Sequence, residues 1–293
     1  MQINLGLLIS GSLGAAALKY LHNVNSVDFV FTNNDSSEII RYCEQNYIPV
    51  YIGNPRKSET DVNYFLKDKH VDYIFSINYL FLVENNILNH PKNFSINLHG
   101  SLLPKYRGRT PHVWAIINGE KETGITAHVM DENCDNGDIV GQIKINIPDL
   151  ATGADILEVF SKKYIEMLDS LLVDIGKNKI QFTKQDITKA TYFGKRTPDD
   201  GLVNWNWQKE RIRNWIRAQA YPYPGAFTFY DEQKLIIDEV EYSEFGFTYD
   251  TPNGTILKID KYLFVKTPNG VVKLTKIRNI DDFKFEENKK FYE

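Results

Sequence analysis

Three side chains between Phe94 and Asp138 have the types that acyl-transfer chemistry needs. Asn97 and His99 alternate with apolar residues in a run that ends at Gly100, and Asp135 follows further along. An amide can donate a hydrogen bond to an oxyanion, an imidazole can move a proton, and a carboxylate can fix the tautomer and charge of that imidazole. A single Asn or His at the end of a strand is more often a hydrogen-bonded turn residue. The prediction therefore depends on the combination of the three residues.

The patterns around these residues predict where they lie. Alternation over 94–99 predicts a strand, with Asn97 and His99 on one face at its C-terminal end. Ligands usually bind at that end of a parallel sheet. The runs 123–130 and 139–147 alternate too and predict a β-hairpin with Asp135 in its turn, facing the end of that strand. We expect His128 to be structural, because it lies in the middle of a strand.

The elements before this stretch predict an α/β fold with a doubly wound, mostly parallel sheet. A Gly-containing turn follows the first strand, but it lacks the full G-x-G-x-x-G pattern of dinucleotide-binding proteins. Backbone N–H groups at this helix start could receive a phosphate or carboxylate, or the segment could simply be a tight turn. Expected strands are 3–9, 27–32, 49–52 and 71–77; expected helices are 15–21, 36–46, 59–69, 111–118 and 153–175.

The pattern of apolar residues and turns changes after about Thr183. Short alternating runs in 226–277 are separated by two Pro-Asn-Gly turns, a pattern that favours a small antiparallel, barrel-like β-domain. A helical stretch runs from Trp207 to Ala220. We expect the tail after Asp281 to be poorly packed apart from its aromatic residues. The predicted domains are 1–185 (catalytic), 186–225 (linker with a helix) and 226–293 (small β-domain).

Composition narrows the classes of partner. The net charge of −4 gives no electrostatic reason to expect nucleic acid. Cys43 and Cys134 are far apart and lack a CxxC partner, which suggests a reduced, cytoplasmic compartment and no metal site. The apolar run near the N-terminus is too short to span a bilayer, so no membrane association is expected.

The motifs together resemble the folate-dependent formyltransferases. Asn97-x-His99 is followed by Ser-Leu-Leu-Pro-x-Tyr-Arg-Gly from Ser101 and by Asp-x-Gly-Asp from Asp135. The resemblance implies a Rossmann-like domain, 10-formyltetrahydrofolate as co-substrate, and Asn97, His99 and Asp135 as the catalytic trio. Asp135 is preferred over Asp138 because the family's Asp belongs to an Asp-x-Gly turn. The match extends more loosely from about Leu5 to about Phe229.

The same resemblance assigns a folate site. The segment just past the expected strand 71–77 is similar to the backbone rim that holds the pterin ring. Tyr79 could instead be a core residue, and for Phe81 the core interpretation is preferred. The residues assigned to the folate site are Ile77, Asn78, Tyr79, Leu80 and Asp138.

Three cations lie in the loop after His99. Lys105, Arg107 and Arg109 could attract a folate glutamate tail or a diphosphate, or could form a solvated loop. Both interpretations stay open at this point.

The phrases Tyr-Phe-Gly-Lys-Arg-Thr-Pro and Pro-Tyr-Pro-Gly-Ala-Phe resemble the sugar-nucleotide branch of the family. Lys195 or Arg196 in the first segment could bind the diphosphate. Tyr221 and Tyr223 at the second segment could stack on the base or form a hydrogen bond with a phosphate. The alternative is ordinary packing of a linker. The residues assigned to substrate binding are Ser10, Gly11, Lys195, Arg196, Tyr221 and Tyr223.

The resemblance implies transfer of a formyl group from 10-formyltetrahydrofolate to the amino group of a nucleotide-linked amino sugar, without a metal. The first choice is a dTDP-3- or 4-amino-dideoxyhexose destined for a surface glycan such as O-antigen or lipopolysaccharide. A uridine diphosphate aminopentose is the second choice. Alternatives are a methionyl-tRNA formyltransferase, a purine-pathway enzyme and a catalytically silent sugar-nucleotide sensor. Homodimers are common in this branch, although no dimer surface can be identified from the sequence.

Overall fold

The computed structural model describes residues 3–292, and the chain forms two compact units. The first unit contains Met1–Gly108, Gly124–Ile145 and Val159–Tyr192, and the second contains Arg109–Thr123, Asn146–Glu158 and Phe193–Glu293. The predicted domain division at residues 185 and 225 stays a prediction. Residues 1, 2 and 293, which the predicted domains include, lie outside the described residues.

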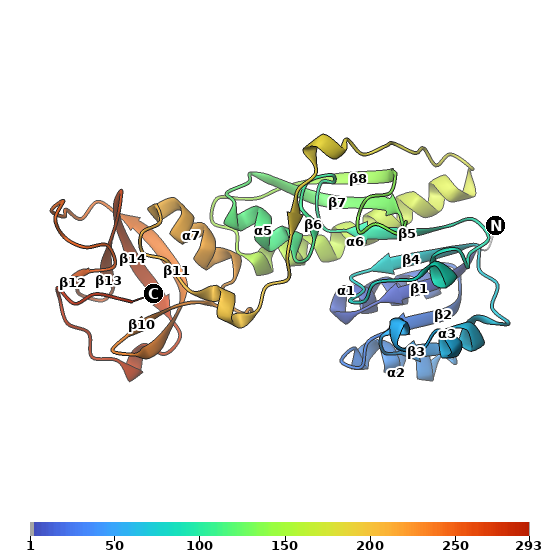
Figure 1. The fold of residues 1–293 in the computed structure, drawn as a ribbon, viewed down its shortest axis with the longest axis horizontal. Helices are drawn as coiled ribbons and strands as arrows, with labels where there is room; N and C mark the ends of the chain where they lie inside the picture. The colour runs from blue at the N-terminus through green and yellow to red at the C-terminus, as the bar shows by residue number, and fades with distance from the viewer. Residues whose placement is uncertain (1–2, 293) are drawn as a thin grey trace. The chain divides into compact units, whose positions relative to one another are not determined.

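A seven-stranded sheet forms the centre of the first unit, in the order β3-β2-β1-β4-β5-β7-β8 (Figure 1). The five strands from β3 to β5 are parallel, and β7 pairs with β5 in the antiparallel sense. The predicted fold class is therefore confirmed. The strands are β1 (Asn4–Ile9), β2 (Ser26–Thr32), β3 (Val50–Ile52), β4 (Tyr73–Ile77), β5 (Phe94–His99), β7 (Glu122–Val129) and β8 (Ile139–Asn146).

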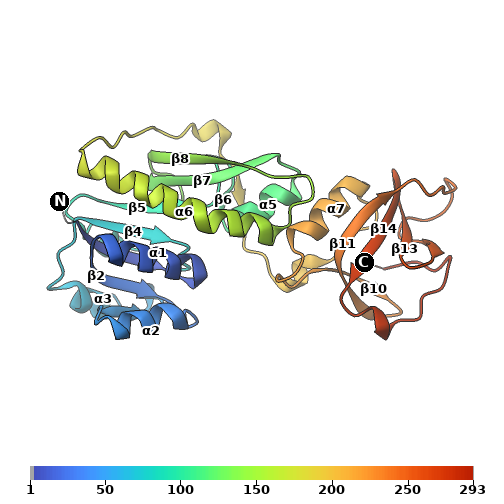
Figure 2. The ribbon, with the colours of Figure 1, turned by 180° about the vertical axis from the view of Figure 1, so that it is seen from behind.

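Helices cover both faces of this sheet. Figure 2 shows α1 (Gly11–Val24) and α6 (Gly153–Gly176) in front of the strands, whereas they lie behind them in Figure 1. The opposite face carries α3 (Glu59–Leu66) and the short α4 (Asn85–Leu88), and α2 (Ser37–Gln45) packs against α1. None of the helices within residues 3–292 is long and apolar enough to cross a membrane.

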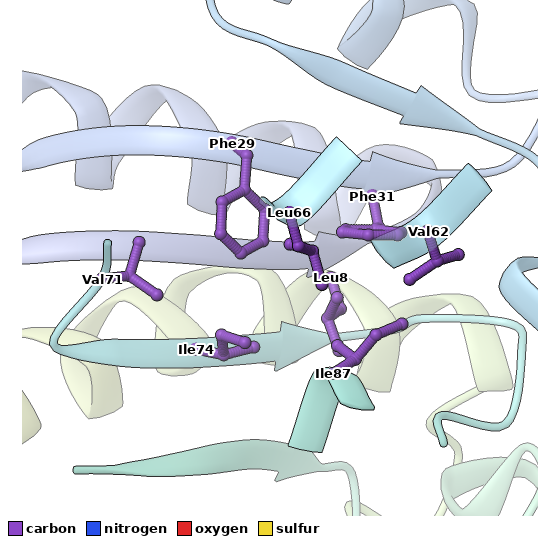
Figure 3. Packing of buried hydrophobic residues seen from close by; sticks show 8 residues of the cluster. All are labelled: Leu8, Phe29, Phe31, Val62, Leu66, Val71, Ile74 and Ile87. Atoms are coloured by element: carbon purple, nitrogen blue, oxygen red, sulfur yellow. The ribbon is translucent and has the colours of Figure 1, made fainter. Parts of the chain in front are cut away.

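A buried apolar cluster joins α3 and α4 to the sheet (Figure 3). Parallel strands that are buried on both faces need continuous runs of apolar residues. This explains why apolar and polar residues do not strictly alternate along these strands. Burial of one such side chain contributes roughly 1.5–3 kcal/mol to folding. The cluster comprises Leu8, Phe29, Phe31, Val62, Leu66, Val71, Ile74 and Ile87.

The strand order reverses direction between β1 and β4, which is where doubly wound sheets bind ligands. Ile77 of β4 pairs with Leu98 of β5, so the segment that starts at Asn78 leaves the sheet at the edge where His99 lies. The first helix begins directly after the strand, at Gly11, rather than at Ala15 as expected.

A two-stranded ladder was not predicted. β6 (Arg107–Gly108) pairs with β9 (Tyr192–Phe193), joined by hydrogen bonds from Arg107 N to Thr191 O and from Arg109 N to Phe193 O. Strands of two residues are too short to show any hydrophobic period, so only the tertiary structure identifies them.

The second unit contains a five-stranded sheet in the order β10-β11-β14-β13-β12, with antiparallel neighbours, and two helices. This confirms the predicted antiparallel β-domain. The elements are α5 (Pro111–Ile117), α7 (Lys209–Ala218), β10 (Ala226–Tyr230), β11 (Gln233–Ser243), β12 (Ile256–Ile259), β13 (Leu263–Thr267) and β14 (Gly270–Ile277). Short 3₁₀ helices span Pro55–Lys57, Ile187–Lys189, Pro198–Gly201 and Ile280–Asp282.

The C-terminal tail is held by its aromatic residues and by backbone pairing. Tyr292 forms a bridge with Phe229 of β10, Lys290 bridges to Thr255, and Phe291 is fully buried. The burial agrees with the expectation, since the aromatic residues pack while most charged residues of the tail are exposed; the backbone pairing with these two segments was not predicted.

Candidate active site

Strand β5 presents Asn97 and His99 to the neighbouring strand β7. The register places Asn97 opposite His128 and His99 opposite Thr126. Side chains directly opposite each other in a sheet share a face, so the amide and both imidazoles meet there. The loop between β7 and β8 returns over this face and brings the Asp135 carboxylate to His99 and Asn97.

The structure brings the three predicted catalytic residues together within the first unit. The Oδ1 atom of Asp135 lies 3.5 Å from Nδ1 of His99 and 3.5 Å from Nδ2 of Asn97. His99 is 7% exposed and Asp135 8% exposed. A buried carboxylate therefore faces an imidazole and an amide that come from a different part of the sequence.

The backbone fixes the tautomer of His99. Its Nε2 atom lies 2.8 Å from the carbonyl oxygen of Tyr106, which can only accept a hydrogen bond, so Nε2 carries the proton. Nδ1 is then free to accept a proton on the side of Asp135. Burial lowers the pKa of His99 despite the opposing charge of Asp135, so the ring is neutral near pH 7.

Asp135 is held as an ionised carboxylate. Burial alone would raise its pKa, but the adjacent imidazoles of His99 and His128 and the hydrogen bond from the Gly108 N–H together lower that pKa well below its ordinary range. The Gly108 N–H donates to Oδ2 at 2.8 Å, and the Cys134 thiol lies 3.4 Å from the same oxygen. The carboxylate can therefore stabilise a positive charge that develops on His99.

The turn that carries Asp135 is tight. Asp135 itself has a φ of 56°, in the left-handed region that non-glycine residues rarely adopt. A Cβ atom on Gly137 would lie 2.0 Å from the carbonyl oxygen of Val129, so no larger residue fits there. The Asp-x-Gly spacing thus follows from packing of the turn against β7.

His128 is the residue that sequence reasoning set aside. Its Nδ1 atom lies 2.8 Å from the carbonyl oxygen of Val129, so Nδ1 donates and Nε2 can accept from Nδ2 of Asn97 at 3.1 Å. The same Nε2 lies 3.5 Å from Asp135. Only the pairing register of β5 with β7 reveals this position, and no local signal in the sequence could have found it.

Ser10 and Gly11 lie at the switch point of the sheet. The Ser10 hydroxyl is buried, and no residue within 3–292 accepts or donates a hydrogen bond to it. Gly11 has a φ of 63°, and its N–H donates to the Ser36 hydroxyl at 3.0 Å. Ser36, the expected N-cap of α2, therefore serves this turn and makes no cap hydrogen bond with its side chain.

The residues assigned to folate begin at the same edge. Asn78 is exposed with a φ of 54°, and its side-chain amide donates to the carbonyl oxygen of Ser10 at 3.0 Å. Leu80 is 41% exposed, whereas Ile77 is buried and Tyr79 packs against the apolar cluster of Figure 3. Asn78 and Leu80 are thus the exposed residues of this segment. Asp138 is half-buried, and its carbonyl accepts from Val129 N.

The remaining substrate residues belong to the second unit. Lys195 and Tyr221 are exposed. The Tyr223 hydroxyl lies 3.0 Å from Nε2 of His112.

The guanidinium of Arg196 lies over the rings of Trp114 and Trp215, at 5.0 and 4.3 Å from their centroids. It also donates to the Asp200 carbonyl and to Gln219. Arg196 is therefore held by local packing, whereas the neighbouring Lys195 side chain is more exposed to solvent.

Arg107, one of the three cations in the loop after His99, fits neither the solvated-loop nor the anion-binding interpretation. Arg107 is fully buried and donates to Asn136, Tyr192 and Gln185, so it neither lies in solvent nor waits for a diphosphate. Its neighbour Lys105 is exposed. Within residues 3–292, no group of three or more His, Cys, Asp or Glu side chains is arranged to hold a metal ion.

Comparison with known proteins identifies the family of the chain. The formyl transferase family matches residues 8–169, and the formyl transferase C-terminal domain matches residues 195–284. The bifunctional polymyxin resistance protein ArnA of Wigglesworthia glossinidia brevipalpis is 40% identical over 225 residues. That alignment covers 76% of this chain but only 34% of the ArnA protein, so the chain spans about a third of that relative.

Solved structures share the fold. WlaRD, a sugar 3N-formyl transferase crystallised with dTDP and 5-N-formyl-THF, superposes with a TM-score of 0.69 at 20% identity, covering 95% of this chain and 99% of WlaRD. An N-formyltransferase from Helicobacter canadensis, in complex with folinic acid and dTDP-3-aminofucose, gives 0.70 at 19% identity, covering 95% and 100%. A 4-N formyltransferase from Francisella tularensis gives 0.66 at 22% identity, covering 80% and 96%.

The buried Asn97–His99–Asp135 arrangement thus lies within the segment that matches the family, and both of the family's domains are present in order along the chain. The chain belongs to the formyl transferase family.

Proposed function

We propose that this enzyme transfers the formyl group of 10-formyltetrahydrofolate to the amino group of a nucleotide-linked amino sugar. The observation that carries the proposal is the contact of the Asp135 carboxylate with both His99 and Asn97 in a buried site. Those three groups meet the needs of acyl transfer to an amine: a donor to the oxyanion, a base, and a charge that stabilises the protonated base.

The roles follow from the hydrogen bonds of each residue. Nδ1 of His99, with Nε2–H committed to Tyr106, would accept the proton that the amine loses as it attacks, and that proton would pass to N10 of tetrahydrofolate as the N10–formyl bond breaks. Asp135 would stabilise the resulting imidazolium. The 3.5 Å contact from Asn97 Nδ2 to Asp135 is long, so this N–H can turn to the formyl oxygen as negative charge develops there.

The folate co-substrate would supply the electrophilic formyl carbon. The residues present fit such a group: Asn78 and Leu80 are exposed on a segment that starts next to the end of β5. Their backbone N–H and carbonyl groups could pair with the donor and acceptor edge of a pterin ring. Asp138 is proposed to support this site from the hairpin turn.

The acceptor is proposed to be a dTDP-linked 3- or 4-amino-dideoxyhexose used for surface glycan or lipopolysaccharide synthesis. The shared fold with WlaRD and with the Helicobacter canadensis enzyme, over 95% of this chain, supports a thymidine nucleotide. The 40% identity to the polymyxin resistance protein ArnA keeps a uridine diphosphate aminopentose as the second acceptor to test.

Binding of the acceptor is proposed to use Ser10 and Gly11 in the first unit and Lys195, Tyr221 and Tyr223 in the second. The buried, unpartnered hydroxyl of Ser10 supports the first assignment, since such a group is normally satisfied by a partner. Exposed aromatic and cationic side chains support the second. A homodimer is proposed as the working assembly.

The test is a screen of the purified enzyme against several dTDP- and UDP-linked amino sugars with 10-formyltetrahydrofolate. Gain of one formyl group by one of these sugars, detected by mass spectrometry, is the expected result. Formylation of methionyl-tRNA with no formylated sugar would contradict the proposal. The net charge of −4 makes that outcome unexpected, because tRNA binding depends on phosphate contacts by cations.

A further inference from the structure

Arg107 is a buried cation whose hydrogen bonds all go to neutral oxygens. Its Nη1 donates to Asn136 Oδ1 at 2.9 Å and to the Tyr192 hydroxyl at 2.6 Å, and its Nη2 donates to Gln185 Oε1 at 2.7 Å. Burial of a charge costs free energy unless the charge is paired and hydrogen-bonded. The arrangement therefore requires a reason beyond simple packing.

Gln185 carries the contact from Arg107 to the turn that holds Asp135. With Oε1 accepting from Arg107, its Nε2 donates to the carbonyl oxygens of Asp135 at 2.9 Å and of Gly137 at 2.8 Å. Asn136 links the same turn directly to the guanidinium. Arg107 thus contacts Asn136 directly and reaches Asp135 and Gly137 through Gln185.

The turn needs such restraint. Asp135 adopts a φ of 56°, a conformation that costs a non-glycine residue free energy and persists only when its surroundings impose it. The Gly108 N–H, adjacent to Arg107, also donates to the Asp135 carboxylate. The short ladder of β6 with Thr191 and β9 fixes this backbone in turn.

We propose that Arg107 is a positioning residue of the formyl-transfer site: its guanidinium orients Gln185 and Asn136, which fix the Asp135 turn beside His99. This inference rests on the proposed role of Asp135 in that reaction. It also accounts for why a strictly buried guanidinium stands where a solvated or phosphate-binding cation was expected.

The charge of Arg107 has a second, electrostatic consequence. Burial lowers the pKa of His99, Asp135 and the Tyr106 carbonyl raise it, and the positive charge of Arg107 lowers it. Besides His128, two further titratable groups lie nearby: the Tyr164 phenol, which donates to the Leu98 carbonyl, and the Cys134 thiol, 3.4 Å from Oδ2 of Asp135. Arg107 therefore favours the neutral, proton-accepting form of His99.

Three variants separate geometry from charge. Arg107→Lys keeps the charge but loses the planar fork, Arg107→Met loses both, and Gln185→Met removes the link while leaving Arg107 in place. Lys184→Met is the matched control, because Lys184 is the exposed neighbour of Gln185.

All three site variants are expected to lower kcat about 10- to 100-fold with little change in either KM, since a misplacement near 1 Å has that effect. Only Arg107→Met should move the acid limb of kcat/KM upward, because only this variant removes a positive charge that lowers the pKa of His99. NMR titration of the His99 imidazole should show the same shift without any turnover. Lys184→Met should match the wild type in every readout.

The proposal is overturned if Arg107→Met keeps wild-type kcat and an unchanged His99 titration, or if it loses only thermal stability. Should Arg107→Met not fold, Arg107→Lys and Gln185→Met decide the positioning role, and wild-type kcat in both would overturn it. A wild-type enzyme that formylates no nucleotide sugar would refute the proposed function alone, because the His99 titration still tests Arg107.

Discussion

The Nδ1 atom of His99 lies 3.5 Å from Oδ1 of Asp135, and both side chains are more than nine-tenths buried. A neutral imidazole with its free nitrogen facing an ionised carboxylate is poised to accept one proton and then to be stabilised by the adjacent charge. This pair explains how the site could remove a proton from an attacking amine without a metal ion.

Replacement of Asp135 by Asn tests that relationship. The variant should lower kcat by about 10²- to 10⁴-fold, because the imidazolium loses its counter-charge. Since the carboxylate raises the pKa of His99, its removal should also lower that pKa and move the acid limb of the kcat/KM profile to lower pH. A profile that stays in place, or moves upward, would show that Asp135 does not act on His99.

Asn97→Ala tests the oxyanion role. Loss of one preorganised donor typically costs roughly 2.7–4 kcal/mol, or about 10²- to 10³-fold in kcat. The KM for the nucleotide sugar should change little, because the Asn97 amide contacts His128 and Asp135 and is assigned to the formyl oxygen rather than to the nucleotide. If KM rises while kcat stays near the wild-type value, Asn97 binds substrate and does not stabilise the oxyanion.

The sequence predicted the fold and the trio because both depend on local signals. Apolar runs identified the parallel strands, and alternation in 123–130 and 139–147 placed Asp135 in a hairpin turn. His128 could not be recognised, because its proximity to Asn97 depends on the register between β5 and β7. Register is a property of the folded sheet and has no signature within either strand.

Arg107 shows the same limit. A cation in a loop between Lys105 and Arg109 has the pattern of a solvated or anion-binding segment, yet it is fully buried. Its partners Gln185 and Tyr192 are far away in sequence and come close only through the pairing of β6 with β9. No charge count within the loop distinguishes these situations.

Gly137→Ala should damage the site through the backbone. The added Cβ would lie 2.0 Å from the Val129 carbonyl oxygen, so the turn and Asp135 must move. We expect a loss of stability of about 1–3 kcal/mol and a loss of kcat of roughly 10²-fold.

Gly246→Ala is the control for that experiment, because nothing lies within 4 Å of the Cβ position there. Urea unfolding and steady-state kinetics measure both variants. Equal stability and equal kcat for the two would contradict the close packing of the Asp135 turn.

Stability should fall as the pH drops below about 6.5, the ordinary pKa of histidine. Burial lowers the pKa of His99, and it lowers the pKa of His112 to about 4, so the unfolded chain binds protons that the native state does not. The free energy of unfolding should therefore decrease between about pH 6.5 and 4. Asp135, whose pKa is lowered in the fold, should add a further loss below about pH 3.9.

Urea titrations at several pH values measure this slope, and His112→Gln provides the internal comparison because it retains a hydrogen-bonding partner for Tyr223. The variant should show a shallower decrease between pH 6.5 and 4 than the wild type. Identical slopes would mean that His112 titrates normally in the folded protein.

The most direct test of the catalytic assignment is a single-turnover measurement of formyl transfer with His99→Asn, using 10-formyltetrahydrofolate and the nucleotide amino sugar that the wild type formylates. The variant should bind the nucleotide sugar as tightly as the wild type, while the rate of formyl transfer falls by at least about 10²-fold, the smallest loss expected when a general base is removed. A variant that folds, binds both substrates and transfers the formyl group at the wild-type rate would contradict the account.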